Sequence, residues 1–290
     1  MANRLIAMDK SPGVCPIGIG KIFCRLFAKC ILFCTGTDAT SECGNFNLCV
    51  GLDAGIEGAA HAMAKFECAV NNNKNKDHHV QAATSTAKSN MPMGDNPNTD
   101  NREAMILVDA RNRFNEINCV VLLWTVQFLW ASGARFAFNC YIHYAILIFC
   151  CIGKERVALH SKEGVTQGDP LSMVLYGLAL VPIAKQLQSF QPNVMQAFYA
   201  DNLAMKGPAS KLGNLMRHLC KLGLEQGYYP EPEKSIVICH PSNKEYVQQQ
   251  LSAFQFKYRI GSQYIGTFVG PISQRTEWLT LHIDQWVFGV

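Results

Sequence analysis

Apolar positions in this chain recur with helical spacing in several segments. Ile22 to Cys34 is the clearest case, with apolar side chains on one face and Arg25 and Lys29 on the other. This pattern predicts an amphipathic helix that ends near Gly36. A second such helix is predicted over 116–130, with Ile117, Val120, Trp124 and Phe128 on one face. Further helices are predicted over 51–66, 135–149, 171–187 (which contains Pro182) and 212–224.

Short apolar runs bounded by polar residues predict strands. Met105–Val108 is such a run and leads directly into Asp109. A hairpin is predicted over 195–205, and further strands over 235–239 and 264–269. The order strand, helices, hairpin, helix, strand predicts an α+β fold.

Residues 71–103 differ from the rest of the chain. They are rich in Asn, Ser, Thr and Asp and contain few apolar residues. Such a segment cannot bury enough surface to offset the cost of ordering it. We therefore expect a disordered insertion or linker here.

Composition adds little about function. The chain has 290 residues, of which 49% are hydrophobic and 17% charged, which is ample for a large core. Its net charge of +4 and pI of about 8.4 permit nucleic-acid binding but do not predict it.

Cysteine usage and hydropathy indicate a compartment. The 13 cysteines include no CxxC pair, which argues against a zinc ribbon. Their odd number and the lack of a secretory leader predict buried thiols in a reducing environment. The most apolar stretch, Tyr141 to Ile152, is too short to span a bilayer. We expect a soluble intracellular protein, nuclear or cytoplasmic, with no membrane partner.

Two aspartates are candidates for metal chemistry. Asp109 closes an apolar strand, and Asp201 lies in the turn of the predicted hairpin. Nucleotidyl transfer uses two divalent cations about 3.5–4 Å apart, held by carboxylates from separate strands. A purely structural explanation is also open, because Asp-Asn is a favourable turn dipeptide and Asp at a strand end often caps a helix.

Three motifs carry a resemblance to a known family. They are Glu-Gly-Val-Thr-Gln-Gly-Asp-Pro-Leu-Ser at 163–172, Phe-Tyr-Ala-Asp-Asn at 198–202, and Leu-Val-Asp-Ala-Arg-Asn-Arg-Phe-Asn at 107–115. Together they resemble the reverse transcriptase domain of a non-LTR (LINE-type) retrotransposon, over about 9–270 without the polar insertion. The resemblance implies a right-hand polymerase palm, an antiparallel sheet packed with helices, with partial fingers and little or no thumb. It also implies RNA-templated DNA synthesis from dNTPs on an RNA template and a DNA primer, with Mg²⁺ or Mn²⁺.

The resemblance also assigns residues. Asp109, Asp201 and Asn202 would hold the metal, and Asp109, Asp201 and Lys234 would be catalytic, with Lys234 protonating the leaving pyrophosphate. Lys234 is equally explained as a surface lysine before a strand, and Phe114, the implied gate against a ribose 2′-hydroxyl, as a core aromatic. The implied nucleotide and template contacts are Phe114, Gln167, Gly168, Asp169, Tyr199 and Lys10, and the implied primer-side residues are Tyr264 and Gly266.

The same resemblance divides the chain. Residues 1–70 would form a fingers-like segment, 71–103 the polar insertion, 104–270 the palm, and 271–290 a truncated thumb-side tail.

Two departures from the family pattern affect its chemistry. Asn202 stands where the family has a second aspartate, and Cys15 stands where it has an arginine that grips the triphosphate. They predict a truncated or decaying copy with reduced activity, or a catalytically inactive remnant that binds nucleic acid. A different two-metal phosphodiesterase is a third reading, but it leaves the Gln-Gly loop and Phe114 unexplained.

Overall fold

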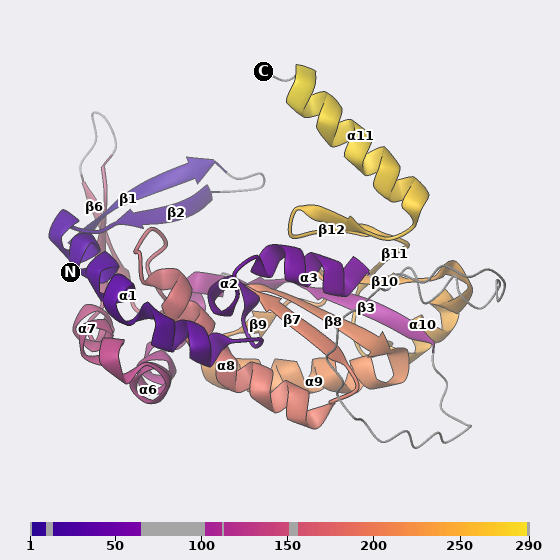
Figure 1. Cartoon of the computed structure of the whole chain (residues 1–290), viewed down its shortest axis with the longest axis horizontal. Coiled ribbons are helices and arrows are strands. Elements are labelled where there is room, and N and C mark those ends of the chain that lie inside the picture. The colour runs from indigo at the N-terminus through magenta and orange to yellow at the C-terminus, as the bar shows by residue number, and fades with distance from the viewer. Residues whose placement is uncertain (1, 10–13, 65–101, 112, 151–155, 289–290) are drawn as a thin grey trace, which may run out of the picture.

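The computed structural model describes residues 2–9, 14–64, 102–111, 113–150 and 156–288. Figure 1 shows a larger sheet with helices on both faces and a smaller sheet at one end of the molecule. The mixed α+β class expected from the sequence is confirmed.

The larger sheet has the strand order β11-β10-β3-β8-β7. Its neighbouring strands are antiparallel except for the β10–β11 pair. The strands are β3 (Glu103–Val108), β7 (Met195–Tyr199), β8 (Asn202–Pro208), β10 (Ile236–Cys239) and β11 (Lys257–Arg259).

Helices cover both faces of this sheet and create two cores. Helices α8 (Ser172–Phe190) and α9 (Ala209–Gln226) lie across one face (Figure 1). Helix α3 (Gly55–Ala64) and the hairpin β12–β13 lie on the other face. Successive residues of β3 therefore point to different cores, with Ile106 in the larger core and Met105 in the smaller.

The smaller sheet has the order β2-β1-β5-β6 and lies beside three helices (Figure 1). Only its β1–β5 pair is parallel. Its strands are β1 (Ala2–Asp9), β2 (Val14–Ile19), β5 (Ala145–Phe149) and β6 (Val157–Ser161), and the helices are α1 (Ile22–Cys43), α6 (Cys119–Leu129) and α7 (Ala131–Tyr141).

The remaining elements are short, apart from the last helix. They are α2 (Leu48–Gly51), β4 (Ala110–Arg111), α5 (Arg113–Glu116), β9 (Tyr229–Pro230), η1 (Pro241–Asn243), α10 (Lys244–Gln250), β12 (Ser262–Tyr264), β13 (Thr267–Val269) and α11 (Ile272–Phe288).

Four strands of the larger sheet and the two long helices against it agree with the sequence predictions, whereas β11 was not predicted. Strands β3 and β10, the β7–β8 hairpin, and helices α8 and α9 all occur where they were expected, within a few residues at each end. Pro182 lies inside α8, as predicted.

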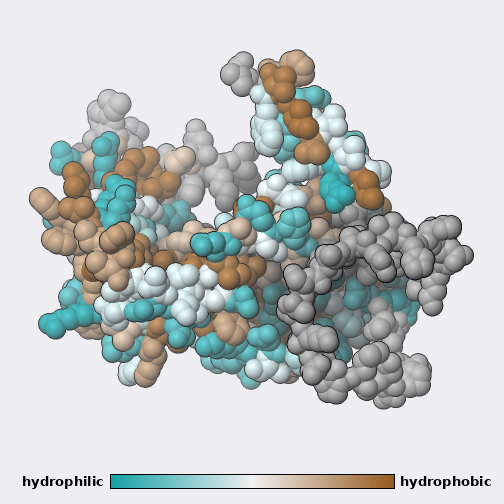
Figure 2. Space-filling view, viewed as in Figure 1, coloured by the Kyte–Doolittle hydropathy of each residue, from teal (hydrophilic) through white to brown (hydrophobic). Residues whose placement is uncertain are grey.

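The prediction for the first helix was wrong in its length and in the face it buries. Helix α1 runs past Gly36 to Cys43, and the apolar stripe from Ile22 (81% exposed) to Phe27 (57% exposed) faces solvent. Its buried residues include Ala28 and Ala39, because small side chains allow the close approach to α7 and α8. Figure 2 shows apolar surface gathered on this end of the molecule.

The predictions for 116–149 also need correction. Helix α6 begins at Cys119 and buries Leu122 and Val126, whereas Trp124 and Phe128 stack on each other at the surface, 5.9 Å between ring centroids. The predicted helix over 135–149 is instead the end of α7 followed by strand β5. A five-residue apolar run does not distinguish helix from strand by periodicity, and here pairing with β1 and β6 selects the strand.

Two other predicted elements are divided. The segment 51–64 forms the end of α2 and then α3, with Ala54 at a φ of 55° between them. The predicted strand 264–269 is a hairpin, β12–β13.

The expectation of buried thiols holds only in part. Of the cysteines that the structure describes, Cys43 and Cys239 are buried, whereas Cys30, Cys34 and Cys150 are exposed.

The predicted division of the chain remains a prediction. The polar insertion lies outside the described residues except for its end, where Glu103 already begins β3. Residues 272–288 form α11, which projects from the body of the molecule with no buried residue (Figure 1). Among the described residues, no helix combines the length and apolar character needed to cross a membrane.

Candidate active site and the loops around it

Asp201 lies in a tight turn between two central strands. Tyr199 pairs with Asn202, so Ala200 and Asp201 form a two-residue hairpin loop. Ala200 has a φ of 52° and Asp201 does not have a positive φ, which is the pattern of a type II′ turn. The fully buried Asn47 supports the turn, because its Nδ2 donates to the Ala200 carbonyl oxygen at 3.2 Å.

Asp109 reaches the same place from the neighbouring strand. Strands β3 and β8 pair up to Val108 and Leu203, so Asp109 follows the last paired residue of β3 and Asn202 precedes its partner. The backbones of Asp109 and Asp201 are therefore brought together at the end of two adjacent strands, as predicted.

A pocket opens at this point. The pocket is open to solvent, and its empty volume, including the solvent-filled mouth, is about 500 Å³. Asp109, Asn202 and Lys234 supply its polar side chains, together with Gln263 and Tyr264 from the β12–β13 hairpin. Asp201 is not among the lining residues. Its Oδ1 accepts a hydrogen bond from Asn202 Nδ2 at 3.2 Å.

The charges near the pocket are arranged around Glu231. Lys234 Nζ lies 2.7 Å from Glu231 Oε2, and this hydrogen bond and charge raise the pKa of Lys234. Asp109 also raises the pKa of Lys234, whereas partial desolvation and the Arg111 guanidinium lower it. Arg111 is itself ion-paired with Glu116 at 3.0 Å, which raises the pKa of Arg111. A protonated Lys234 at the pocket is the state that a proton donor requires.

The residues predicted to contact the primer lie on the pocket wall and its rim. Tyr264 is buried, and its hydroxyl has no hydrogen-bond partner among the described residues. Burial raises the pKa of Tyr264. Ile265 and Gly266 form the turn, and both have positive φ (37° and 79°), the pattern of a type I′ hairpin. A β-branched residue at positive φ is an outlier, and Ile265 also lines the pocket.

Phe114 lies outside this pocket. It is partly buried and packs against the ring of Tyr176, with the centroids 4.3 Å apart. Its carbonyl oxygen accepts from Val165 N at 2.7 Å, which holds the 107–115 motif against the 163–172 motif. Both readings of Phe114, as a gate and as a core aromatic, stay open.

The Gln167-Gly168 loop contacts the smaller sheet. Gly18 N in β2 donates to Gln167 O at 2.8 Å, and Gly168 has a φ of 97°. A Cβ atom on Gly168 would come within 2.8 Å of Gly18 O, so glycine is required for this backbone approach.

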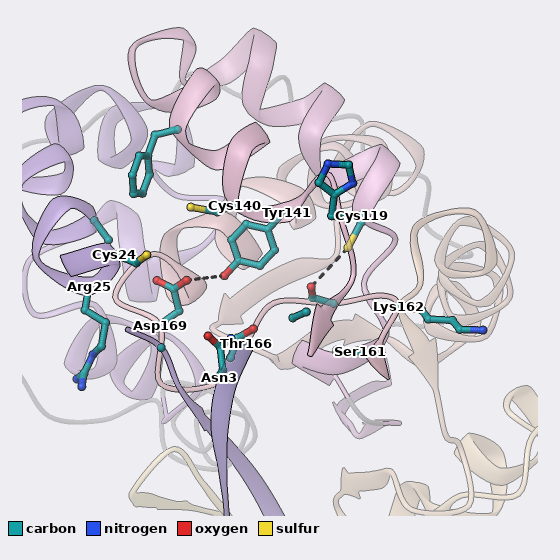
Figure 3. Close-up of a pocket in the computed structure, with 16 residues that line it drawn as sticks. Asn3, Cys24, Arg25, Cys119, Cys140, Tyr141, Ser161, Lys162, Thr166 and Asp169 are labelled. Atoms are coloured by element: carbon teal, nitrogen blue, oxygen red, sulfur yellow. Dashed lines mark hydrogen bonds between the residues drawn. The ribbon is translucent and has the colours of Figure 1, made fainter. Parts of the chain in front are cut away.

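Asp169 faces a different pocket (Figure 3). Its Oδ2 accepts from the Tyr141 hydroxyl at 2.9 Å, and its Oδ1 accepts from Leu171 N at 2.9 Å at the start of α8. Burial, and then the Asp169 carboxylate, raise the pKa values of Tyr141 and Cys140, the latter to about 11. Asp169 thus lines this pocket and not the one at Asp109, and its carboxylate holds the start of α8 and Tyr141. Its nucleotide contact remains a prediction.

Tyr199 is the last residue of β7 and directly precedes the Ala200-Asp201 turn. Its pKa is raised, mainly by desolvation and to a smaller extent by the neighbouring Cys49. The pKa of Cys49 is raised in turn, mainly by burial. Lys10 lies outside the described residues, and Cys15 is in β2.

Sequence reasoning missed two residues beside the site, Glu231 and Ser235. Both belong to the segment Tyr-Tyr-Pro-Glu-Pro-Glu-Lys-Ser at 228–235, whose Pro-Glu-Pro-Glu composition is a turn signal. The turn is visible in the sequence, but its contact with Asp109 is not. Among the described residues, no group of three or more His, Cys, Asp or Glu side chains is placed to hold a metal.

No family model matches this chain, and no curated protein gives a significant match. Solved structures do resemble it. Apo telomerase from Candida tropicalis superposes with a TM-score of 0.60 at 10% identity, covering 93% of this chain and 47% of that one. Telomerase from Candida albicans in complex with a fragment of telomeric RNA gives a TM-score of 0.57 at 9% identity, covering 93% and 45%. This chain thus spans about half the length of these proteins, and at such identity the likeness establishes a reverse-transcriptase-like fold alone.

Proposed function

We propose that this chain is the palm and partial fingers of a reverse transcriptase of the non-LTR retrotransposon type. Its reaction is RNA-templated transfer of nucleotides from dNTPs to the 3′-hydroxyl of a DNA primer. The observation that carries the proposal is the position of the Asp201 turn beside Asp109, which lines a pocket together with Asn202, within a telomerase-like fold. The RNA named for one of the telomerase structures supports an RNA partner.

The residues fit a magnesium or manganese site of the polymerase kind. Asp109 and Asp201 offer carboxylate oxygens, and Asn202 offers an amide oxygen, which are ligands that Mg²⁺ accepts together with substrate phosphates. When bound, the metal pair supplies activation of the primer hydroxyl and charge stabilisation of the leaving pyrophosphate.

The chain's own side chains supply the other parts of the reaction. Lys234, kept protonated by Glu231, donates a proton to the pyrophosphate. Phe114 excludes the ribose 2′-hydroxyl. Gln167 and Gly168 contact the paired nucleotide, with Lys10, Asp169 and Tyr199 as further nucleotide or template contacts. Tyr264 and Gly266, on the hairpin beside the pocket, support the primer end.

One observation favours a second function, that of an inactive remnant that binds nucleic acid. Asn202 Nδ2 occupies one carboxylate oxygen of Asp201, which is an oxygen that a metal would need. A metal must break this hydrogen bond or turn the Asn202 amide before it can use both oxygens. The replacement of a carboxylate by Asn202 therefore weakens the site in two ways, through charge and through geometry.

Primer extension separates the two functions. The assay uses a DNA primer on an RNA template with dNTPs and either Mg²⁺ or Mn²⁺, and fluorescence anisotropy measures binding of the same duplex. The proposal expects extension by the wild type and none by Asp201→Asn. Binding without extension in either metal, by folded protein, supports the inactive remnant.

A further inference from the structure

A turn late in the chain surrounds the backbone of Asp109. Asp109 N donates to Ser235 Oγ at 3.0 Å, and Glu231 N donates to Asp109 O at 2.7 Å. Both backbone groups of Asp109 are thus held by residues more than a hundred positions later in the chain. Ser235 is fully buried, so water does not compete for its hydroxyl.

The hydroxyl of Ser235 is itself oriented. Its Oγ donates to Glu231 O at 2.8 Å, which leaves the oxygen lone pairs to accept from Asp109 N. Ser235 N bonds to Glu231 O at 3.0 Å, so the turn is closed by backbone as well as side-chain bonds. The Ser235 hydroxyl, the Glu231 carbonyl oxygen and the Glu231 N–H therefore form one closed ring of hydrogen bonds with the backbone of Asp109.

This ring replaces the sheet at a critical position. The paired register of β3 with β8 ends at Val108, and its register with β10 ends at Leu107. The next residue, Asp109, is the link between β3 and the separate pair β4–β9. The Ser235 and Glu231 bonds therefore fix the Asp109 backbone, from which its carboxylate projects, at the point where strand pairing ends.

We infer that Ser235 is a positioning residue for metal binding, which holds Asp109 so that its carboxylate is directed toward the pocket shared with Asn202 and Lys234. The inference rests on the proposed function of Asp109 as a metal ligand. The same turn also contains Lys234, whose ammonium group is ion-paired with the Glu231 side chain. One segment therefore positions both the Asp109 backbone and the Lys234 side chain at the pocket. Hydrogen-bond partners of metal ligands typically change metal affinity by about 10–100-fold when they are removed.

A purely structural role for Ser235 would also cost stability, so stability does not test the inference. Metal affinity does. The test is titration of the full chain with Mn²⁺, without primer or dNTP, with free Mn²⁺ measured by electron paramagnetic resonance. Ser235→Ala removes the hydroxyl, and Ser235→Cys replaces it with a somewhat larger group that is a weaker acceptor. Circular dichroism establishes that each variant is folded.

Thr35 provides a matched control. Its Oγ1 donates to Ile31 O at 2.9 Å and accepts from Trp130 Nε1 at 3.2 Å, the same double use of a hydroxyl, in the helix α1. Thr35→Val removes that hydroxyl with little change of shape. We expect Thr35→Val to bind Mn²⁺ with wild-type affinity. Its loss of thermal stability should be similar to that of Ser235→Ala.

The expected result is an Mn²⁺ dissociation constant roughly 10-fold higher in Ser235→Ala than in the wild type, with Ser235→Cys between them. Wild-type affinity in a folded Ser235→Ala or Ser235→Cys variant would overturn the inference and leave the proposed function intact. If the wild type and Asp109→Asn bind Mn²⁺ equally, the metal role of Asp109 is wrong, and the inference fails with it.

Discussion

Replacing Asn202 by aspartate tests the charge balance at the Asp201 turn. The amide now donates to Asp201 Oδ1 at 3.2 Å, and Asn202→Asp converts this donor into a second anion at the same place. Two unit charges at about 4 Å repel by about 1 kcal/mol in water and about 4 kcal/mol at an effective dielectric constant of 20. Both residues are half-buried, so the repulsion lies between these limits.

The expected effect on the metal-free protein is a loss of stability. For a chain of this size, each 1 kcal/mol lowers the melting temperature by roughly 2–4 °C, so Asn202→Asp should melt roughly 2–16 °C below the wild type in EDTA. Mg²⁺ or Mn²⁺ should reverse this, because a cation binds the two carboxylates more tightly than one carboxylate and an amide. The measurement is a thermal melt by circular dichroism with EDTA and then with each metal.

Asn202→Ala is the control for the lost hydrogen bond, because it removes the donor without adding charge. It should lower the melting temperature less than Asn202→Asp and show no additional gain with metal. The reasoning is refuted if Asn202→Asp melts with the wild type in EDTA, or if metal stabilises the two variants equally.

The same substitution predicts a change of activity. If the chain extends primers, Asn202→Asp should raise the rate. The replacement of the triphosphate-gripping arginine by Cys15 can mask this gain, so Cys15→Arg and the double variant are included. A folded double variant that binds the duplex but extends no primer would favour the inactive remnant.

Three further predictions concern the turn, the proton donor and the core. Ala200→Gly should raise the free energy of unfolding by roughly 0.5–1 kcal/mol, because glycine adopts the φ of 52° without strain; urea denaturation that shows a loss instead would contradict the strain. Glu231 raises the pKa of Lys234, and a proton donor is lost as pH rises through its pKa, so Glu231→Gln should move the alkaline limb of the kcat–pH profile to lower pH; an unmoved limb would exclude Lys234 as the donor. Trp130→Phe removes the indole N–H that donates to Thr35 O at 2.9 Å and should cost roughly 1–3 kcal/mol by urea denaturation for the bond, with a further cost for the cavity left at this fully buried position; a total cost below about 0.5 kcal/mol would show that this bond is not important.

Local sequence was sufficient for the elements around Asp109 and Asp201. The Met105–Val108 run, the two-residue turn at Ala200 and the long apolar segment of α8 each depend on contacts or turn geometry within a few residues, and each was predicted. Their roles in catalysis remain predictions, because no ligand contact tests them.

Periodicity did not identify which face of a helix is buried. In α1 the large apolar side chains such as Phe23 face solvent and small residues such as Ala28 are buried, and in α6 Trp124 and Phe128 face solvent while Leu122 and Val126 are buried. The apolar area of a hydrophobic stripe determines how much free energy its burial would release. It does not determine whether a partner surface can approach closely enough to bury it.

The sequence by itself determined the order of most elements of the larger sheet, the Asp201 turn and the motifs that suggest a polymerase. Only the tertiary structure decided that β5 is a strand, that Asp169 accepts a hydrogen bond from Tyr141, and that Ser235 holds Asp109 from 126 residues away. The physical reason is the range of the interactions. Turn geometry and helical spacing act between near neighbours, whereas strand pairing and buried hydrogen bonds join segments whose proximity exists only once the chain has folded.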